Sequence, residues 1–565
     1  MSPSSPEAKP GGRRLSVYHL LFLAFSVGFV ALQLIYVATL PLNMDEFLGG
    51  YHAYEVVRKT PYAEFQPYKT LLGYYPQALL LSIAPDTWSG LMWTKVYLVL
   101  VNGAMMVVGA FTVAREFRKS AVLCALVLFG CMSTFLERSL ELRVDMMTAW
   151  MGFLSLLLLV RGRPGWAGVL VALSFLTSQK GIYFVVAGFA GLAALRFSSL
   201  RRASDTRAAL HYGAAALAVL LLYLGLWSAV AGPRAVFSAT FLSHQDVVLD
   251  HVNGPMHAKW WGQSIWRNAF YYAFLVLGLW RLERLRSLGK LERAHLLTLA
   301  YGVVTMALCL AHSKPWPYFL VFLFPTAFVV HTAYLDAESR GQPARRGWMA
   351  GMSWPMLAAF VGLGVYTPLM RVPQVLKRDL SPQRDTLQVA EHLLSGDETY
   401  FAGINFMYRA EQVDRYLGIL GTRTVKEIGR DRQAQARYVE TMRGANMKFV
   451  IRSYRIKRLP KLMKKFIDEN YAHLWANVDI YAPTMVRGGA FELKFGGHYT
   501  VMSGKGLKVD GQALKRGQKV HLAAGAHESQ AEGKFRLKLI PNDFEAGLGP
   551  ATKRRRKLFP KIYNF

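Results

Sequence analysis

The sequence predicts a polytopic α-helical membrane protein with a folded, extracytoplasmic region at its C-terminal end. Of its 565 residues, 53% are apolar and only 18% are charged, whereas soluble domains carry about 25% charged residues. The apolar residues form blocks of bilayer-spanning length that end near residue 370. Beyond that point, helical patterns and short alternating strands replace them. An apolar content this high excludes a disordered chain.

The positive charge of the chain indicates a membrane surface rather than nucleic acid. Lys and Arg outnumber Asp and Glu by 67 to 36, which gives a formal net charge of +31. In a soluble protein this excess would indicate a nucleic-acid partner. Here 36 of the 67 basic residues lie after residue 370 and the others lie mainly between apolar blocks, and the basic run at 553–557 suits anionic lipid headgroups. We therefore expect the lipid bilayer, and no nucleic acid, as a partner.

About eleven apolar blocks are long enough to be considered as spans. The first follows Arg13 and Arg14, but it exceeds the apolar stretch of a secretory signal and no small-residue cleavage site follows it, so we expect it to be retained. The predicted spans are 17–40, 88–113, 120–136, 144–160, 166–178, 182–195, 209–231, 267–280, 295–311, 316–335 and 348–369.

The distribution of Lys and Arg predicts the orientation. The N-terminal segment and one set of alternate loops hold about 20 of these residues, and the opposite loops hold about 10. The N-terminus is therefore predicted to be cytoplasmic, in a bacterial-type inner (plasma) membrane, and an odd number of spans places the C-terminal region outside. Cys124, Cys131 and Cys309 all lie within spans, so we expect no disulfide framework.

The regions outside the membrane divide into three parts. Within the transmembrane domain at 1–370, the first outer loop (41–87) holds two amphipathic segments, 45–60 and 67–84, which are typical of interfacial helices. Residues 371–490 have the pattern of an α/β region with buried strands at 399–403 and 447–451. Residues 491–565 alternate between short strands and glycines, as in a small β-sandwich with a basic tail. Its predicted strands are 491–495, 498–502, 507–509, 519–522 and 534–540.

Charged residues gather at the outer ends of the predicted spans, where they are costly unless they bind or react. A carboxylate there could accept a proton from a hydroxyl, and cations could hold a phosphate. Each residue alone also fits a structural role at a helix N-terminus, in a salt-bridge cluster or as a snorkelling lysine. The candidates are Asp45, Glu46, Lys69, Glu141, Arg143, Asp145, Lys180, His244 and Asp246.

The loop before the eighth span also contains metal-ligating residue types, in His244, Asp246, Asp250 and His251. Loop histidines are more often solvated than metal-bound, so we expect no metal site, with a divalent metal in this loop as the alternative. The sequence contains no Gly-rich phosphate-binding loop and no zinc-finger spacing. No other cofactor is indicated.

Five short elements occur in a fixed order along the chain. They are Asn43-Met44-Asp45-Glu46-Phe47 after the first span, Tyr68-Lys69 before the second interfacial segment, Leu142-Arg143-Val144-Asp145 at the fourth span, Leu176-Thr177-Ser178-Gln179-Lys180-Gly181 between spans five and six, and Pro317-Tyr318-Phe319 with Pro325 in a late span. This order resembles the GT-C integral-membrane glycosyltransferases, in particular the protein O-mannosyltransferases and the lipid A aminoarabinose transferases. The resemblance covers roughly residues 15–340, and one departure is Thr70 after the loop lysine, where relatives often have Pro.

This resemblance implies an inverting glycosyl transfer from a polyprenyl-phosphate-linked donor to a lipid, glycan or protein acceptor on the outer face. It implies that Asp45 is the catalytic base or the acceptor-binding partner of that base, with Glu46 assisting. Lys69, Arg143 and Lys180 would hold the donor phosphate. Acceptor-binding or supporting roles would then fall to Asp145, Glu141, His244 and Asp246.

Two other classes of protein also have many spans. A secondary transporter would show internal repeats and Gly- or Pro-broken spans near the midplane, and neither is visible here. A non-catalytic envelope-assembly subunit would tolerate substitution around Asp45 and Lys69. Within the enzyme class, a metal-dependent oligosaccharyltransferase-type enzyme stays open through the His/Asp loop.

Overall fold

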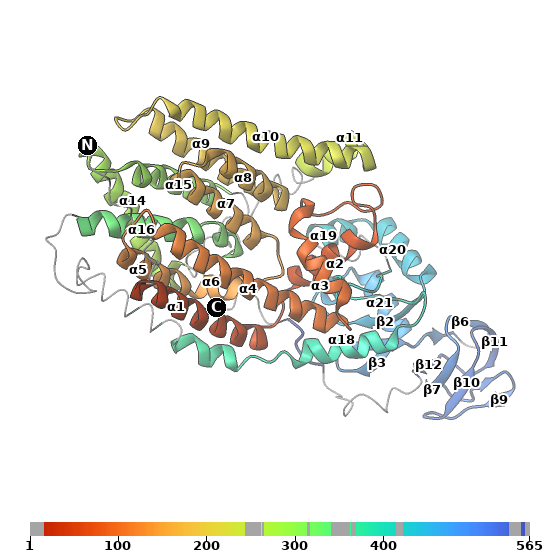
Figure 1. Ribbon diagram of the computed structural model, residues 1–565. Helices are drawn as coiled ribbons and strands as arrows, with labels where there is room; N and C mark the ends of the chain where they lie inside the picture. The colour runs from red at the N-terminus through yellow and green to blue at the C-terminus, as the bar shows by residue number, and fades with distance from the viewer. Residues whose placement is uncertain are drawn as a thin grey trace, which may run out of the picture.

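The chain forms a helical bundle, an α/β unit packed against one end of it, and a small β-module at the far end (Figure 1). We describe a computed structural model. Its described residues are 16–242, 262, 265–312, 317–340, 362, 366, 369–413, 422–486, 488–541 and 555–559.

Helices occupy the predicted spans from the first to the tenth. Four of them, α1, α4, α10 and α15, are long and apolar enough to cross a bilayer. The predicted span at 120–136 is divided by a turn at Cys131 into α5 and α6. The span at 348–369 lies almost wholly outside the described residues, so the count of eleven stays a prediction. The helices are α1 (Val17–Thr39), α4 (Thr87–Val113), α5 (Lys119–Gly130), α6 (Ser133–Arg138), α7 (Asp145–Val160), α8 (Pro164–Thr177), α9 (Ile182–Arg196), α10 (Ser204–Ala231), α14 (Ala269–Ser287), α15 (Arg293–Leu310) and α16 (Phe324–Arg340).

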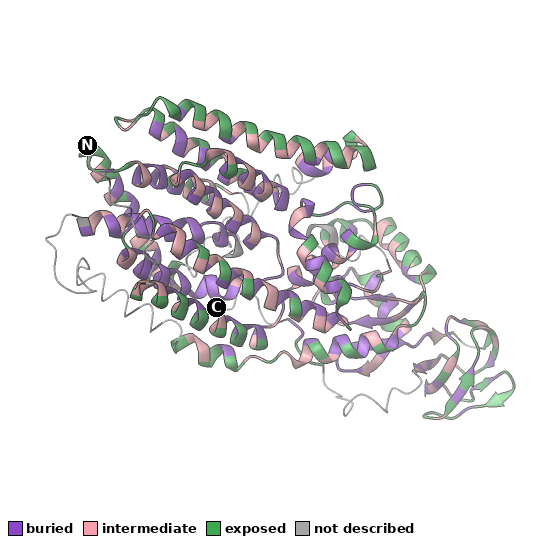
Figure 2. Cartoon of the chain, viewed as in Figure 1, coloured by how far each residue is buried: buried purple, intermediate pink, exposed green. Residues whose placement is uncertain are grey.

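Helix α10 lies on the outside of the bundle, and most of its outward surface is left exposed by the rest of the described chain (Figure 2). Only 6% of its most apolar stretch is buried, and Leu217, Leu222 and Leu226 are exposed. A soluble protein rarely exposes an apolar face of this length. The face therefore fits contact with lipid.

The two amphipathic segments predicted in the first outer loop are helical. The first is α2 (Met44–Arg58), and the second comprises a short 3-10 turn, η1 (Leu71–Gly73), followed by α3 (Tyr75–Ile83). Phe47 on α2 stacks on Phe406 of the C-terminal region, with ring centroids 4.6 Å apart. The buried apolar residues of this loop belong to the same cluster as the core of the C-terminal region, whereas the bundle has a separate cluster.

The α/β unit is built on a four-stranded sheet in the order β1-β2-β4-β3. Strands β1 and β2 are parallel, and β4 is antiparallel to both β2 and β3. The amphipathic helices α18 and α21 bury one apolar face each, at Leu387 and Ile467 among others. The elements are α18 (Ser381–Leu393), β1 (Thr399–Phe401), α19 (Thr422–Arg430), α20 (Arg432–Gly444), β2 (Met447–Ile451), α21 (Lys461–Asn470), β3 (Tyr471–Trp475) and β4 (Val478–Tyr481).

The β-module consists of two four-stranded antiparallel sheets, in the orders β10-β7-β12-β5 and β6-β11-β8-β9. It begins at β5, a few residues before the predicted boundary at 491. The sequence pattern did not indicate β5, β9 or β11, because the first two are two residues long and β11 is largely polar and exposed. The strands are β5 (Thr484–Met485), β6 (Gly489–Leu493), β7 (Gly497–Ser503), β8 (Lys508–Val509), β9 (Gln512–Ala513), β10 (Lys519–Leu522), β11 (Gly525–Gln530) and β12 (Phe535–Ile540).

Polar contacts dock the α/β unit on the end of α3 and the start of α4. The Tyr408 hydroxyl donates to the Leu81 carbonyl over 3.1 Å, and Arg409 donates to the Pro85 carbonyl over 2.9 Å. The Thr87 N–H donates to the Glu391 carboxylate over 2.9 Å. These bonds satisfy carbonyls at the end of α3 and an N–H at the start of α4, which helices leave without intrahelical partners.

The C-terminal segment 555–559 returns to the first outer loop. Arg555 donates to both carboxylate oxygens of buried Asp479 over 3.0 Å. The Gln383 side chain, which is buried, donates to the carbonyls of Leu42 over 2.8 Å and Leu558 over 2.9 Å. Gln383 thereby joins α18, the first outer loop and the C-terminal segment.

We expect Phe559→Ala to destabilise the docked assembly. Phe559 is buried and its ring contacts Phe47, Phe406 and Tyr454 at centroid distances of 5.8–6.0 Å. Truncation of such a side chain costs about 3–5 kcal/mol. A lowered melting temperature of the purified protein would show this. Val486→Ala, at a position 74% exposed, is the control, and equal melting of both variants would contradict the docking role.

Candidate active site

A pocket of about 90 Å³ lies where the first outer loop meets the segment between α6 and α7. One wall is formed by the first turns of α2 and by the stretch before η1. The opposite wall is formed by residues 142–145 at the start of α7. The charged residues that line the pocket are Asp45, Lys69, Arg143 and Asp145.

The position of Asp45 follows from how α2 begins. The Asn43 side chain accepts the N–H of Glu46 over 3.1 Å, and the Glu46 carboxylate accepts the N–H of Asn43 over 2.6 Å. This reciprocal capping box fixes the first turn of the helix. The Asp45 carboxylate then lies at the positive end of the α2 dipole and is 38% exposed.

One face of α2 approaches the 142–145 segment very closely. A Cβ atom at Gly49 would lie 2.2 Å from the carbonyl oxygen of Leu142, so only glycine fits there. Asp45, Gly49 and His52 are spaced at i, i+4 and i+7, which places them on one helix face, and all three line the pocket. The close packing at Gly49 brings this face up to Arg143.

Four charged groups alternate in sign along one side of the pocket. Arg143 donates to Asp45 over 2.5 Å and, through its Nε, to Asp145 over 2.7 Å. Lys180, in the 3-10 turn η2 (Gln179–Gly181), contacts the other oxygen of Asp145 at 3.0 Å. Asp145 is only 4% exposed, whereas Asp45 is the most accessible member of the series. Asp145 therefore holds two cations in place, and Asp45 is the carboxylate that is open to solvent.

Two aromatic rings surround the Lys180 ammonium. Its Nζ lies 4.8 Å from the ring centroid of Phe319 and 5.3 Å from that of Phe322, both in η4 (Pro317–Phe322). Cation–π contacts of this kind stabilise a partly desolvated ammonium. His312 stacks on Phe319, with centroids 4.0 Å apart. His312 therefore helps to hold the ring that contacts the Lys180 ammonium.

Lys69 is the most deeply buried cation of the pocket. It follows Tyr68, and its Nζ lies 4.9 Å from the Tyr68 ring centroid. Burial, with the positive charges of Lys180 and Arg143 adding to it, lowers the pKa of Lys69 to about 7. Burial likewise lowers the pKa of Lys180, against the opposing effect of Asp145. An anion in the pocket would favour the charged form of both lysines.

Glu46 lies outside the pocket lining, in a buried network behind it. Its carboxylate contacts the Lys95 ammonium of α4 at 3.1 Å, and both side chains are 2% exposed. The same oxygen accepts the Leu142 N–H over 3.3 Å. Glu46 thus ties α2 to α4 and to the opposite wall of the pocket.

The remaining predicted site residues lie elsewhere. Glu141 is paired with Arg138 at 2.6 Å, and burial raises the pKa of Glu141. Within the part of the chain that the structure describes, no group of three or more His, Cys, Asp or Glu side chains could hold a metal ion. The predicted candidates His244, Asp246, Asp250 and His251 lie outside the described residues.

Sequence reasoning missed His52, Tyr68 and Tyr74 as lining residues and Lys95 as the partner of Glu46. The spacing of His52 from Asp45 could have indicated the first of these. A lysine in the middle of an apolar span was a signal for Lys95, because such a residue requires a partner.

We expect Glu46→Ala to reduce stability strongly, because it leaves the buried Lys95 ammonium without its carboxylate. Loss of one partner of a buried ion pair costs about 3–5 kcal/mol. The combined Glu46→Gln, Lys95→Met variant should recover much of this, and Glu64→Ala, at an exposed position of the same loop, should melt like the parent. Melting temperatures test all three, and a Glu46→Ala protein as stable as the parent would contradict the assignment.

Comparison with known proteins gave matches among solved structures alone. No family model matches the chain, and no curated protein matches it. ArnT from Cupriavidus metallidurans in the apo state aligns with a TM-score of 0.55 at 10% identity, over 82% of this chain and 97% of ArnT.

Two further structures align with lower scores. ArnT from the same organism bound to undecaprenyl phosphate has a TM-score of 0.48 at 12% identity, over 76% of this chain and 92% of ArnT. The Archaeoglobus fulgidus oligosaccharyltransferase in the apo form has a TM-score of 0.47 at 13% identity, over 85% of this chain and 73% of that enzyme. On the ArnT apo alignment, which covers nearly all of that enzyme, the chain has the fold of ArnT.

Proposed function

We propose that the protein is an inverting glycosyltransferase that moves a sugar from a polyprenyl-phosphate-linked donor to a lipid, glycan or protein acceptor at the outer face of a bacterial-type inner membrane. The observation that carries this proposal is the charge arrangement of the pocket. An accessible carboxylate, Asp45, lies beside three cations, Lys69, Arg143 and Lys180, at the membrane end of a chain with the GT-C fold.

The cations suit a phosphate that is attached to a lipid. Lys69 and Arg143 line the pocket, and Lys180 contacts the lining residue Asp145 at 3.0 Å. These three cations outnumber the two carboxylates, so this group of five residues has one excess positive charge when all three cations are protonated. Arg143 offers a fork of N–H donors that matches phosphate oxygens. The exposed apolar face of α10 and the interfacial helices α2 and α3 provide a lipid-facing border on which a prenyl chain could lie.

In the proposed reaction, the acceptor hydroxyl oxygen attacks the anomeric carbon from the face opposite the phosphate. The bond from the anomeric carbon to the phosphate oxygen breaks as the new glycosidic bond forms. Asp45 takes the hydroxyl proton, and polyprenyl phosphate leaves with the bonding electron pair, its charge stabilised by the cations. Configuration at the anomeric carbon is inverted.

The Asp45–Arg143 contact suggests an order for the steps of the proposed reaction, with donor binding before proton transfer. Arg143 contacts the Asp45 carboxylate at 2.5 Å. A donor phosphate would compete for the Arg143 guanidinium and place negative charge nearby, and both effects make a carboxylate a better proton acceptor. Asp145, which also holds Arg143 and Lys180, keeps the cations in position during this exchange.

Glu46, Glu141 and Asp145 then act through other residues, as positioning groups. The His/Asp loop at 244–251 stays a prediction as an acceptor-binding or metal-binding element.

We expect Asp45→Asn to abolish transfer, because the amide cannot accept the hydroxyl proton. General-base catalysis contributes about 10²–10⁴-fold to rate. A strain of the native host from which the gene has been deleted should lack one sugar on an envelope glycan, as mass spectrometry would show. The parent gene and Glu64→Gln should restore that sugar. If Asp45→Asn restored the sugar when expressed at the level of the parent protein, the proposed role of Asp45 would be contradicted.

We expect the affinity for a polyprenyl phosphate to depend on Lys69 protonation. With a pKa of about 7 in the free protein, Lys69 is mostly charged at pH 6 and mostly neutral at pH 8.5, so its contribution to phosphate binding is present below pH 7 and lost above it. If Lys69 is charged in the complex, the affinity for the polyprenyl phosphate falls by up to about thirtyfold between pH 6 and pH 8.5.

Undecaprenyl phosphate is a suitable probe, since ArnT has been solved with it bound. Lys69→Arg is the matched variant, because its guanidinium stays charged throughout. Ionisation of the phosphate itself affects both proteins equally, so the ratio of their dissociation constants isolates Lys69. Parallel pH profiles for the two proteins would contradict the prediction.

A further inference from the structure

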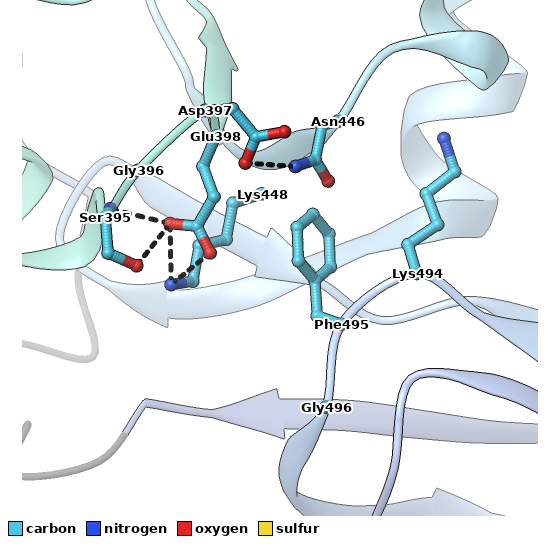
Figure 3. Close-up of a pocket in the computed structure, with 9 residues that line it drawn as sticks. All are labelled: Ser395, Gly396, Asp397, Glu398, Asn446, Lys448, Lys494, Phe495 and Gly496. Atoms are coloured by element: carbon cyan, nitrogen blue, oxygen red, sulfur yellow. Dashed lines mark hydrogen bonds and ion pairs between the residues drawn. The ribbon is translucent and has the colours of Figure 1, made fainter.

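A second cavity, of about 430 Å³, lies between the α/β unit and the β-module (Figure 3). Its walls come from the turn before β1, the start of β2 and the loop between β6 and β7. Since β1 and β2 are parallel, the cavity lies at the N-terminal ends of both strands. The candidate active site lies toward the C-terminal ends of these strands. Arg455, which follows β2, donates to the sulfur of Met44 at the start of α2 over 3.2 Å.

The polar side chains of this cavity are held in place by one another. The Asn446 amide donates to Asp397 over 3.2 Å, and Glu398 contacts Lys448 at 2.8 Å and accepts the Ser395 N–H over 2.7 Å. Figure 3 shows these side chains converging from separate segments. A preorganised set of this kind binds a ligand without first losing side-chain freedom.

The cavity carries no net charge, which decides the class of ligand. Its two carboxylates, Asp397 and Glu398, are balanced by two ammonium groups, Lys448 and Lys494. Lys494 donates to the backbone carbonyl of Ala445 over 2.7 Å, so its ammonium is held by the backbone and is not directed at a bound anion. A phosphate or a carboxylate ligand would meet as much negative as positive charge here.

Hydrogen-bonding capacity remains for a neutral ligand with many hydroxyls. Among the described residues, the second carboxylate oxygen of Asp397 and the side-chain oxygen of Asn446 accept no hydrogen bond. Both can accept from hydroxyl groups, and a hydroxyl can in turn accept from ammonium or amide N–H groups. Phe495 adds an apolar surface to the lining, which suits the C–H face of a sugar ring.

We propose that this cavity binds a neutral saccharide unit. The proposal rests on the proposed function in one respect, namely that the saccharide belongs to the acceptor. Strand β2 has five residues and rises about 3.3 Å per residue, so roughly 15 Å or more separates this cavity from Asp45. An acceptor that occupies both sites is therefore an oligosaccharide or a glycolipid with several sugars rather than a single hexose.

Saturation-transfer NMR on the full-length protein in lipid nanodiscs tests the cavity directly. Nanodiscs are needed because detergents with glycoside headgroups would compete. The probes are the methyl glycosides of glucose, galactose, mannose and N-acetylglucosamine, with glucuronate and inorganic phosphate as charged probes. We expect binding of at least one neutral glycoside, with a dissociation constant at least about tenfold higher in the Asp397→Ala, Asn446→Ala variant.

Two variants make the result specific. Glu492→Ala removes an exposed carboxylate of β6 that does not line the cavity and should bind as the parent does. Asp45→Asn should also bind normally, so that glycoside binding and glycosyl transfer are read separately. No glycoside binding, equal binding by the Asp397→Ala, Asn446→Ala variant, or binding of the charged probes alone would overturn the proposal. Failure of the proposed function would instead appear as envelope-glycan restoration by Asp45→Asn.

Discussion

The buried ion pair between Glu46 and Lys95 is the contact on which the candidate active site depends. Two charges that are each 2% exposed are stabilised when they are paired with each other and accept or donate further hydrogen bonds. Glu46 meets this condition by capping α2, by accepting the Leu142 N–H and by contacting Lys95. These three bonds set the start of α2 relative to α4 and to the far wall of the pocket. Asp45, one residue earlier, is positioned as a result.

The C-terminal region holds the same helix from the other side. Arg455 contacts Met44, Phe406 stacks on Phe47, and Phe559 closes over both phenylalanine rings. The first outer loop thus shares a hydrophobic cluster with the C-terminal region, and this cluster also includes residues from the ends of α4, α8 and α10. The C-terminal region therefore supports the first outer loop, and the second cavity lies at the opposite end of β1 and β2.

The candidate active site combines rigid and exchangeable charges. Asp145 is buried and holds Arg143 and Lys180, whereas Asp45 is accessible and shares Arg143. Because of this difference in burial, Asp145 holds the cations in position, whereas Asp45 is accessible from the pocket. The same principle separates Glu46 from Asp45, although the two are neighbours in sequence.

The sequence by itself determined the apolar helices of bilayer-spanning length and the two helices of the first outer loop, because these depend on local apolar length and periodicity. It also indicated Asp45, Lys69, Arg143, Asp145 and Lys180 as one set, because a charge at the end of a span is costly without a purpose. Only the tertiary structure decided that Glu46 contacts Lys95 and faces away from the pocket. It alone brought residue 559 back to residue 47 and formed the cavity between Asn446 and Phe495. These contacts join residues far apart in the chain, and no local pattern of hydrophobicity or charge encodes which distant surfaces will meet.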